Sequence, residues 1–363
     1  MFEDSRQDSA FAQDPEETQH FEDCVLAFKE YSMDMMGEVA RREKHMNSLP
    51  VEHKAKLKSE TLRKFEGLKT CVRANQEFFE QMISQYRVST GSVMKSEPHH
   101  MSKVRLVLHQ IAREWSEEGN EERSQCFDPI LEQLKKHCSP KDKVLCPGAG
   151  LGRLPVEIVG AGYACEGNEF SYHMLLVSDF IMNKLNEENE KVIHPWLDGV
   201  TNVYRSEDLT RPVKIPDRTT RQIMTNNEEP LLSMCAGEFI QSYKNDRNTH
   251  DCVVTCFFID TAANVFKYIE TIHAVLKPGG KWINHGPLMW HWYAPGFTSN
   301  PDVKQEARYD ESVELSYDEL KAVIESYGFK FLHESKKTCN YSSNIKSMMS
   351  TVYNTVLFTC TKE

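Results

Sequence analysis

The chain lacks several features that mark whole classes of protein. It has no run of about 18 apolar residues, so we expect no membrane span and no membrane partner. Residues 1–20 are acidic and polar, without the basic start and apolar middle of a signal peptide. The 11 cysteines include no CxxC pair. This argues against a disulfide scaffold or a zinc module and favours a cytoplasmic location, with the nucleus as a further compartment.

An excess of positive charge is also missing. The net charge of −11 argues against a nucleic-acid partner, because a phosphate backbone requires a basic surface. The chain shows no internal repeat. What is present is ordinary for a globular protein, with 40% hydrophobic and 27% charged residues. A length of 363 residues suits one large α/β domain with a helical addition.

The first part of the chain is dominated by helical periodicity. After a tail at 1–20 that we expect to be disordered, residues 21–140 form a predicted helical region. Apolar residues recur every three or four positions in stretches that predict helices at 21–46, from Pro50 to Val72, from Val104 to about Gly119, and at 127–138, with a third apolar stripe at 78–86 and a break at 91–98. Its amphipathic helices before residue 90 either pack on the domain that follows or offer a surface for a homodimer, and periodicity does not decide between the two.

From Lys143 onward, short apolar runs alternate with helical stretches. Strands are predicted at 143–147, 163–168, 251–259, 281–288, 328–334 and 352–361, and helices at 151–161, 170–186, 262–276 and 316–327. This alternation predicts an α/β domain over 141–363, a mostly parallel sheet with helices on both faces. Residues 187–232 are polar and too long for an ordinary connection, which predicts an insertion near the site.

A glycine turn follows the first predicted strand. Residues 144–152 read Val-Leu-Cys-Pro-Gly-Ala-Gly-Leu-Gly, so that Gly148 and Gly150 lie between a strand and a helix and present backbone N–H groups. Glu169 follows about 20 residues later at the end of the next strand, where a carboxylate accepts hydrogen bonds from ribose hydroxyls. Together they predict an adenosine-containing cofactor in a Rossmann-like sheet. The alternative is a tight turn that holds no ligand.

The spacing of the glycines in the turn distinguishes between two kinds of cofactor. A dinucleotide site usually has a glycine at the sixth position of the turn, and Arg153 stands there. The order glycine turn, acidic residue, strand closed by Asp260 and then Leu-Lys-Pro-Gly-Gly at 276–280 is that of class I S-adenosylmethionine-dependent methyltransferases. The pattern therefore favours S-adenosylmethionine over NAD.

Longer motifs carry a more specific resemblance. The stretch 144–155, Gly-Asn-Glu-Phe-Ser at 167–171, the helix at 104–116 and Asn-His-Gly-Pro-Leu at 284–288 resemble the carnosine N-methyltransferase family, from roughly residue 20 to the C-terminus. The resemblance implies methyl transfer from S-adenosylmethionine, which leaves S-adenosylhomocysteine. The acceptor would be the imidazole nitrogen of carnosine (β-alanyl-histidine) or a related histidine-containing peptide, and the product from carnosine would be anserine. Such a direct displacement requires no metal.

The resemblance implies further cofactor contacts. Gln110 and Arg113 share one helix face, from which they would reach the methionine end of the cofactor. Glu238 and Phe239 match an acid–aromatic pair beside the adenine, although the family often has Asp in place of Glu238. Cys256 would line the same wall. Alternatively, Gln110 and Arg113 form a solvated polar face of their helix, and Cys256 is a buried structural cysteine.

The reaction requires a group that orients the imidazole ring. Asp260 is the candidate carboxylate, which would accept the N–H of the nitrogen that does not attack. His291 is the second candidate, and Tyr341 and Tyr353 would line the dipeptide pocket by resemblance. Alternatively, Asp260 is a helix N-cap, His291 is a packed structural residue, and the two tyrosines belong to the core.

Other functions remain open at this stage. Methylation of histidine in a protein or peptide would use the same chemistry. Base methylation is disfavoured because the strand ends Ile-Asp-Thr-Ala at 259–262, without a Pro-Pro-aromatic motif. A scaffold that only binds partners through its helices, or a dehydrogenase, fits the polar strand ends less well.

Overall fold

The computed structural model describes residues 15–86, 98–225, 231–293, 309–341 and 344–363. These residues form two compact units that interleave along the chain. The helical unit comprises the described parts of 1–120, 172–219 and 342–350, and the sheet unit those of 121–171, 220–341 and 351–363. The sequence analysis instead divided the chain into continuous segments, with the helical region ending at residue 140.

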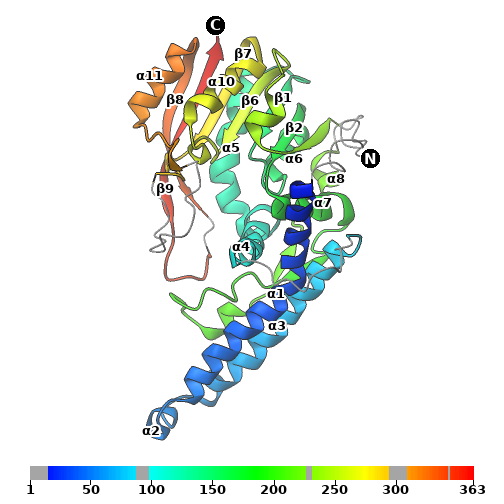
Figure 1. The fold of residues 1–363 in the computed structure, drawn as a ribbon, viewed down its shortest axis with the longest axis vertical. Helices are drawn as coiled ribbons and strands as arrows, with labels where there is room; N and C mark the ends of the chain where they lie inside the picture. The colour runs from blue at the N-terminus through cyan, green and yellow to red at the C-terminus, as the bar shows by residue number, and fades with distance from the viewer. Residues whose placement is uncertain (1–14, 87–97, 226–230, 294–308, 342–343) are drawn as a thin grey trace. The chain divides into compact units, whose positions relative to one another are not determined.

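Two long helices dominate the helical unit. α1 (Pro15–Asn47) and α3 (Ser59–Ile83) run side by side in opposite directions and are joined by the short α2 (Val51–Lys54) (Figure 1). Their apolar stripes meet, and the rings of Phe28 and Phe79 lie 5.0 Å apart. The predicted third stripe at 78–86 is largely the end of α3 and not a separate helix. α1 begins at Pro15, so residues 15–20 are helical and not disordered; residues 1–14 lie outside the described part.

The remaining elements of this unit come from distant parts of the chain. α4 (Pro98–Trp115) leads into a 3-10 turn, η1 (Glu117–Gly119), and α7 (Tyr172–Lys184) packs against α1, α3 and α4. The predicted insertion at 187–232 contains a small antiparallel pair, β3 (Lys191–Ile193) and β4 (Val213–Ile215), with η2 (Ser206–Leu209) between them. It therefore has secondary structure of its own. The predicted break at 91–98 lies largely outside the described residues.

The sheet unit contains seven strands in the order β5-β2-β1-β6-β7-β9-β8. The first five are parallel, and β9 is antiparallel to both of its neighbours. Their bounds are β1 (Lys143–Pro147), β2 (Ala164–Glu169), β5 (Leu232–Ala236), β6 (His250–Cys256), β7 (Leu276–Gly286), β8 (Phe329–Asn340) and β9 (Val352–Lys362). The Rossmann-like sheet predicted from the sequence is confirmed. The prediction missed β5, a five-residue strand.

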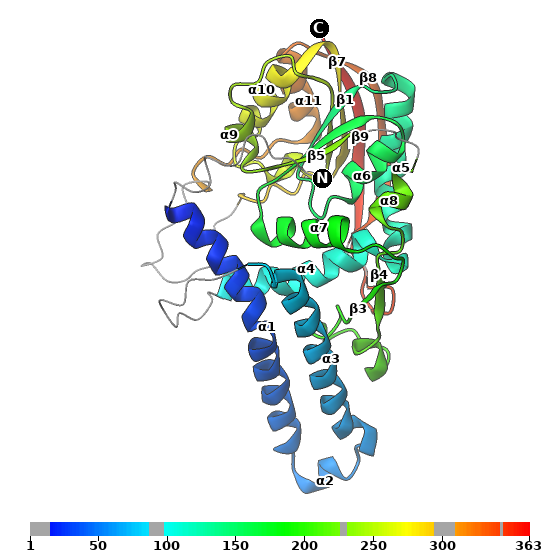
Figure 2. The same ribbon diagram turned by 90° about the vertical axis from the view of Figure 1, so that its right-hand side faces the viewer.

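Helices cover both faces of the sheet (Figure 2). α5 (Asn120–His137) and α6 (Arg153–Gly160) lie on one face, while α9 (Phe239–Tyr243), α10 (Val265–Val275) and α11 (Tyr317–Ser326) lie on the other; α8 (Thr220–Ile223) is a single turn. Under α10 and α11 the fully buried ring of Trp282 meets the edges of Phe329 and Phe358, with centroids 5.5 and 5.1 Å away. Among the described residues, no helix combines the length and the apolar character needed to cross a membrane.

The register of the parallel strands fixes where polar residues gather. Pro147 at the end of β1 pairs with Asn168, and Glu169 at the end of β2 pairs with Ala236. Because the carboxyl ends of neighbouring parallel strands meet at one edge, the segments after β1, β2, β5, β6 and β7 share that edge. This carboxyl edge is where most of the predicted site residues lie.

Candidate active site

The glycine turn is closed by the carboxylate predicted to bind ribose. Glu169 Oε2 accepts a hydrogen bond from the Gly150 N–H at 2.8 Å. Its Oε1 accepts from the N–H groups of Phe170 and Ser171 at 2.9 and 2.8 Å. Burial raises the pKa of Glu169, while these three backbone donors act in the opposite direction. Glu169 thus fastens the turn to the end of β2, in addition to any contact with ribose.

The glycines themselves adopt conformations that other residues avoid. Gly148, Gly150 and Gly152 have φ values of 68°, 57° and 81°. A Cβ at Gly148 would lie 2.4 Å from the ring of Phe258, so the absence of a side chain there serves packing against the segment after β6. This packing explains Gly148 from within the protein, while the N–H groups of the turn stay at the carboxyl edge.

Two acidic residues lie on neighbouring strand ends. The Gly237 N–H donates to the Glu169 carbonyl at 2.9 Å, and the Asn168 amide donates to the Gly237 carbonyl at 2.9 Å. These bonds tie the ends of β2 and β5 together just before Glu238. The structure therefore brings Glu169 and Glu238 to adjacent positions on the carboxyl edge.

Glu238 and Phe239 also have structural duties. Glu238 is the N-cap of α9, and its Oε2 accepts from the Gln241 N–H at 2.8 Å. Phe239 is 3% exposed and meets Phe258 and Tyr268 edge to face, with ring centroids 5.5 and 5.4 Å apart. Its ring is therefore part of the core beneath the edge, and the adenine stacking expected from the sequence stays a prediction.

Asp260 lies in η3 (Ile259–Thr261), directly after the end of β6, and is 2% exposed. Its Oδ2 accepts from the Met289 N–H at 2.9 Å, and its carbonyl accepts from the His291 N–H at 3.0 Å. Burial raises the pKa of the carboxyl, while the Met289 N–H and His291 act to lower it. Asp260 is a buried acceptor that fixes the segment following β7. Its own N-cap alternative is not realised, because the cap of α10 is Asn264.

His291 lies at the same edge but faces a different environment. Its backbone is held by Asp260, while the residue itself is exposed. The preceding Trp290 is 7% exposed, has a φ of 41°, and donates its indole N–H to the Leu315 carbonyl at 3.0 Å. A non-glycine residue with positive φ is strained and is held there by its surroundings. The structure thus brings Asp260 and His291 together and makes Trp290 the anchor of the loop.

An aromatic cluster forms beside the end of β6. Phe257 stacks on Tyr341 with centroids 4.9 Å apart and planes at 23°, and Tyr353 meets both rings edge to face at 6.0 and 5.8 Å. All three residues are partly exposed. Phe257 has a φ of 50°, and Gly286 allows the close approach, since a Cβ there would lie 3.1 Å from the Phe257 backbone. The cluster offers ring faces and edges to a flat ligand.

The sequence analysis missed Phe257, which lies three residues before Asp260. Its position next to a strand end was visible, but Phe-Phe-Ile at 257–259 resembles the continuation of a buried strand. The positive φ turns Phe257 out of that strand, and only the structure shows this. The structure brings Tyr341 and Tyr353 together, and their role in a dipeptide pocket stays a prediction.

Beneath the cluster, His285 is fully buried and its two nitrogens are both engaged. Nδ1 lies 2.9 Å from the Cys126 carbonyl, so it carries the proton and donates. Nε2 then accepts from the Thr355 hydroxyl at 2.9 Å. Hydrogen bonding from Cys126, with His285 beside it, lowers the pKa of the Cys339 thiol. His285 joins α5, β7 and β9, and its imidazole is therefore a structural element. Cys256 pairs with it across β6 and β7.

The two remaining cofactor candidates belong to the helical unit. Gln110 and Arg113 lie in the last two turns of α4, and Arg113 is 9% exposed. Among the described residues, the buried Gln110 Oε1 has no hydrogen-bond partner. A buried acceptor without a donor costs about 1–3 kcal/mol, so the helix suits a ligand that donates to it. The chain then folds back at Gly119, where a Cβ would lie 1.9 Å from the Arg113 carbonyl.

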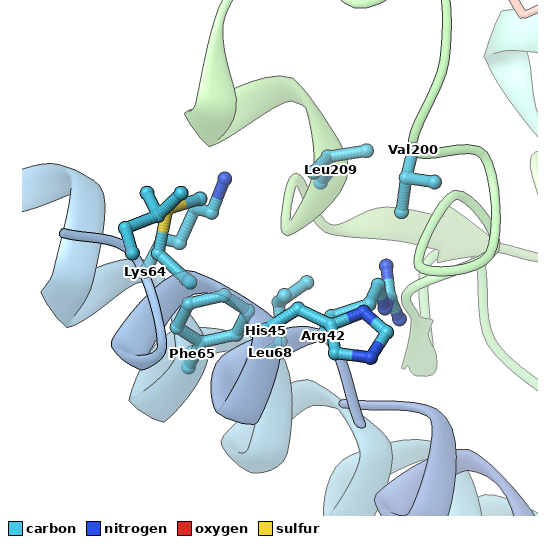
Figure 3. Close-up of a pocket in the computed structure, with 9 residues that line it drawn as sticks. Arg42, His45, Lys64, Phe65, Leu68, Val200 and Leu209 are labelled. Carbon is cyan, nitrogen blue, oxygen red and sulfur yellow. The ribbon is translucent and has the colours of Figure 1, made fainter. Parts of the chain in front are cut away.

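A pocket of about 380 Å³ opens elsewhere in the helical unit. Phe65 and Leu68 of α3 face Val200 and Leu209 (Figure 3). The polar side chains around them are Arg42, His45 and Lys64. None of the predicted site residues lines it. We assign this pocket no part in methyl transfer.

Comparison with known proteins shows the family of this chain. The sequence profile of the carnosine N-methyltransferase family matches residues 90–363. The chain belongs to the carnosine N-methyltransferase family. Membership in this family, together with the strand order of the sheet, confirms the predicted class I methyltransferase fold.

The similarity to individual members of the family extends over nearly the whole chain. It is 36% identical to the carnosine N-methyltransferase of Mus musculus, over 95% of this chain and 86% of the relative. It is 34% identical to that of Schizosaccharomyces pombe, over 96% of both chains, and 34% identical to that of Dictyostelium discoideum, over 94% and 76%. The family resemblance inferred from the motifs is thus confirmed.

Proposed function

We propose that this protein is an S-adenosylmethionine-dependent N-methyltransferase that methylates an imidazole nitrogen of carnosine and so produces anserine. The observation that carries the proposal is the family match over residues 90–363, which includes the carboxyl edge with Asp260. The substrate is then a small histidine-containing peptide, and related di- and tripeptides share the group that reacts.

The residues at the glycine turn suit S-adenosylmethionine. The N–H groups of the turn would lie along the methionine part, Glu169 would accept from ribose hydroxyls, and Glu238 would accept from the adenine amine. Gln110 Oε1 and the Arg113 guanidinium would hold the amino and carboxylate groups of the methionine end. When bound, the cofactor supplies an electrophilic methyl group on a sulfonium.

The protein's task in the reaction is to aim an imidazole. With a reference pKa near 6.5, an imidazole is mostly neutral at neutral pH and one nitrogen carries a lone pair. A buried carboxylate that accepts the N–H of the other nitrogen selects the tautomer, orients the ring and stabilises the positive charge that develops. Asp260 fits this role because it is 2% exposed and its position is fixed by two backbone hydrogen bonds.

The aromatic cluster supplies the binding surface for the dipeptide. The rings of Phe257, Tyr341 and Tyr353 offer stacking to the imidazole. The two phenol groups offer hydrogen bonds to the polar ends of the dipeptide. His291, on the exposed loop held by Asp260, is the second candidate for contact with the peptide. Because each of these groups has a further contact in the fold, a pocket formed by them would be organised before the substrate enters.

The direct test is a product analysis. Purified protein is incubated with carnosine and S-adenosylmethionine, and mass spectrometry with fragmentation locates any added methyl group. A methyl group on the imidazole ring supports the proposal. Failure to methylate carnosine, with methylation of histidine in a protein instead, would replace it by the protein or peptide alternative.

Two finer predictions accompany this proposal. We propose that the enzyme acts in the cytoplasm and the nucleus, without a nucleic-acid or membrane partner. We also propose a homodimer through the N-terminal helices, where Met33 of α1 is 55% exposed. Light scattering measures the oligomeric state of the full chain, and the Met33→Glu variant serves as the comparison.

A further inference from the structure

Three side chains with the chemistry of metal ligands meet inside the helical unit. Cys24 of α1, His100 of α4 and His173 of α7 are 0%, 3% and 1% exposed. One ligand atom from each lies within 4.8 Å of the other two. None of the three was singled out by the sequence, since they are far apart along the chain and form no motif.

The distances between these atoms lie near those of a tetrahedral site. Cys24 Sγ lies 3.6 Å from His173 Nδ1 and 3.8 Å from His100 Nδ1. His100 Nδ1 lies 3.3 Å from the other ring nitrogen of His173, Nε2, and only one nitrogen of a ring can bind a given ion. With one ligand atom from each residue, the three atoms lie within 4.8 Å of one another. Zinc bonds of about 2.3 Å to sulfur and about 2.0–2.1 Å to nitrogen place tetrahedral ligands roughly 3.3–3.6 Å apart, so the rings have to turn inward by about 1 Å to surround one ion.

Burial disfavours a charge on each of the three side chains. It lowers the pKa of His100 and of His173 and raises the pKa of Cys24. Zinc binds a neutral imidazole and a thiolate, so a bound ion would hold Cys24 in its deprotonated form.

A fourth position is available on α1. His20 precedes Cys24 by one helical turn, on the same face, and its ring lies 5.6 Å from that of His100. It is partly exposed, so it lies between the buried cluster and the solvent. The acidic residues Glu17 and Asp23 and the cationic Lys103 also act on the cluster. Two carboxylates and one ammonium leave an excess of negative charge near the three ligands.

We propose that Cys24, His100 and His173 bind a zinc ion that joins α1, α4 and α7, with His20 or a water molecule as the fourth ligand. Sulfur and imidazole together are the ligand set that zinc favours. Binding releases the Cys24 thiol proton to solvent and forms one sulfur–zinc and two nitrogen–zinc bonds. The site is structural, and it is separate from the residues assigned to methyl transfer.

The rival interpretation is a chain of hydrogen bonds without metal. In that chain the Cys24 thiol donates to His173 Nδ1, and His173 Nε2–H donates to His100 Nδ1. The two interpretations differ in what the purified protein does with a divalent cation. Cobalt distinguishes them, because a thiolate–cobalt bond produces a charge-transfer absorption that a thiol does not.

The experiment uses the full chain, treated with a chelator and then titrated with Co²⁺ and with Zn²⁺ alone. The expected result is one equivalent of Co²⁺ with a thiolate charge-transfer band, which Zn²⁺ displaces. Cys24→Ser removes the band, and His100→Gln weakens zinc binding by more than the about 10- to 100-fold typical of losing an outer-shell partner. Cys71→Ser is the matched control, a buried cysteine of α3 whose Sγ lies 3.7 Å from the Thr210 carbonyl.

Two results would overturn the proposal. One is that the wild-type chain takes up no cobalt and no zinc after chelation. The other is that Cys24→Ser keeps the charge-transfer band. Circular dichroism checks that each variant is folded. Should Cys24→Ser unfold, the melting temperature decides, because zinc must raise it in the wild type and in Cys71→Ser but not in His100→Gln.

Discussion

The Asp260 carboxylate holds the backbone of Met289, because its Oδ2 accepts a hydrogen bond from the Met289 N–H at 2.9 Å. The same residue accepts the His291 N–H on its carbonyl at 3.0 Å. One buried side chain thus connects the end of β6 to the segment that follows β7. The group assigned to orient the substrate is itself oriented by the loop next to it.

Asp260→Asn tests the role of this charge. The amide oxygen still accepts from Met289, so we expect the loop to stay in place and the affinity for S-adenosylmethionine to be unchanged. The loss of the charge that stabilises the developing imidazolium should lower kcat by about 100-fold or more. Steady-state kinetics with carnosine and calorimetry with the cofactor measure the two effects.

Asp246→Asn is the control for this substitution. Asp246 lies in the same unit, in the loop after α9, and within the described part of the chain it forms hydrogen bonds through its backbone N–H and carbonyl. It should retain full activity. Normal turnover of Asp260→Asn would show that the carboxylate does not participate in methyl transfer.

The pH dependence of stability tests whether burial raises the pKa of the Asp260 carboxyl. Because burial raises the pKa of its carboxyl, the folded protein binds this proton more tightly than the unfolded chain does. The resulting stabilisation is present below the ordinary pKa and is lost as the pH rises through the raised folded value. Denaturant unfolding should therefore show that Asp260→Asn gains stability relative to the wild type between about pH 4 and pH 7. A difference that is constant over this range contradicts the assignment.

Glu169→Gln tests the closure of the glycine turn. The amide places an NH₂ group where the carboxylate accepts from Gly150, or from Phe170 and Ser171. We expect the affinity for S-adenosylmethionine to fall about tenfold, since a charge-assisted hydrogen bond is worth about 1.5–3 kcal/mol. Glu166→Gln, in the same strand, is the control, because Glu166 accepts from Tyr243 instead. Equal affinities for the two variants in calorimetry would refute the role of Glu169.

Tyr341→Phe separates hydrogen bonding from stacking in the substrate pocket. The ring stays stacked on Phe257, and only the hydroxyl is lost. We expect the KM for carnosine to rise by about fivefold with little change in kcat, as for one hydrogen bond of about 1 kcal/mol. Tyr327→Phe loses a hydroxyl bonded to Glu270 on α10 and should leave the KM unchanged. A KM for Tyr341→Phe equal to that of this control would place Tyr341 in the core alone.

Gly148→Ala tests how much the close packing of the glycine turn against Phe258 contributes to the free energy of unfolding. The added methyl group meets the Phe258 ring at 2.4 Å in addition to the strain of a φ of 68°. Gly279→Ala has a similar φ of 75° with no atom within 4 Å, so it carries the strain alone. We expect Gly148→Ala to lower the free energy of unfolding by about 1–3 kcal/mol more than Gly279→Ala does. Equal losses in chemical denaturation would mean that Phe258 moves aside freely.

Much of the sheet unit could be predicted from the sequence. The apolar runs that became β1, β2, β6 and β9 are bounded by glycine, proline or charged residues, and parallel strands send their carboxyl ends to one edge. Those two facts suffice to gather Gly150, Glu169 and Asp260. β5 escaped because it is short and only Leu232 in it is fully buried, so no apolar pattern separates it from the polar stretch before it.

Other features depend on tertiary contacts that a sequence pattern does not contain. The helical pattern of α7 predicted its existence but not its membership in the helical unit. The positive φ of Phe257 follows from the chain leaving β6, and the meeting of Cys24 with His173 bridges helices that are far apart in the sequence. Local propensity is blind to such contacts, which is why these residues were missed.

The place of β9 in the sheet has a consequence for biosynthesis. Val352–Lys362 leaves the ribosome after β7 and β8 but lies between them, and β8 has no other strand partner in the described structure. Until β9 emerges, β7 presents an open edge and β8 has nothing to pair with. This half of the sheet therefore closes only after β9 is translated, and a nascent chain that stops short of β9 is a natural client for chaperones.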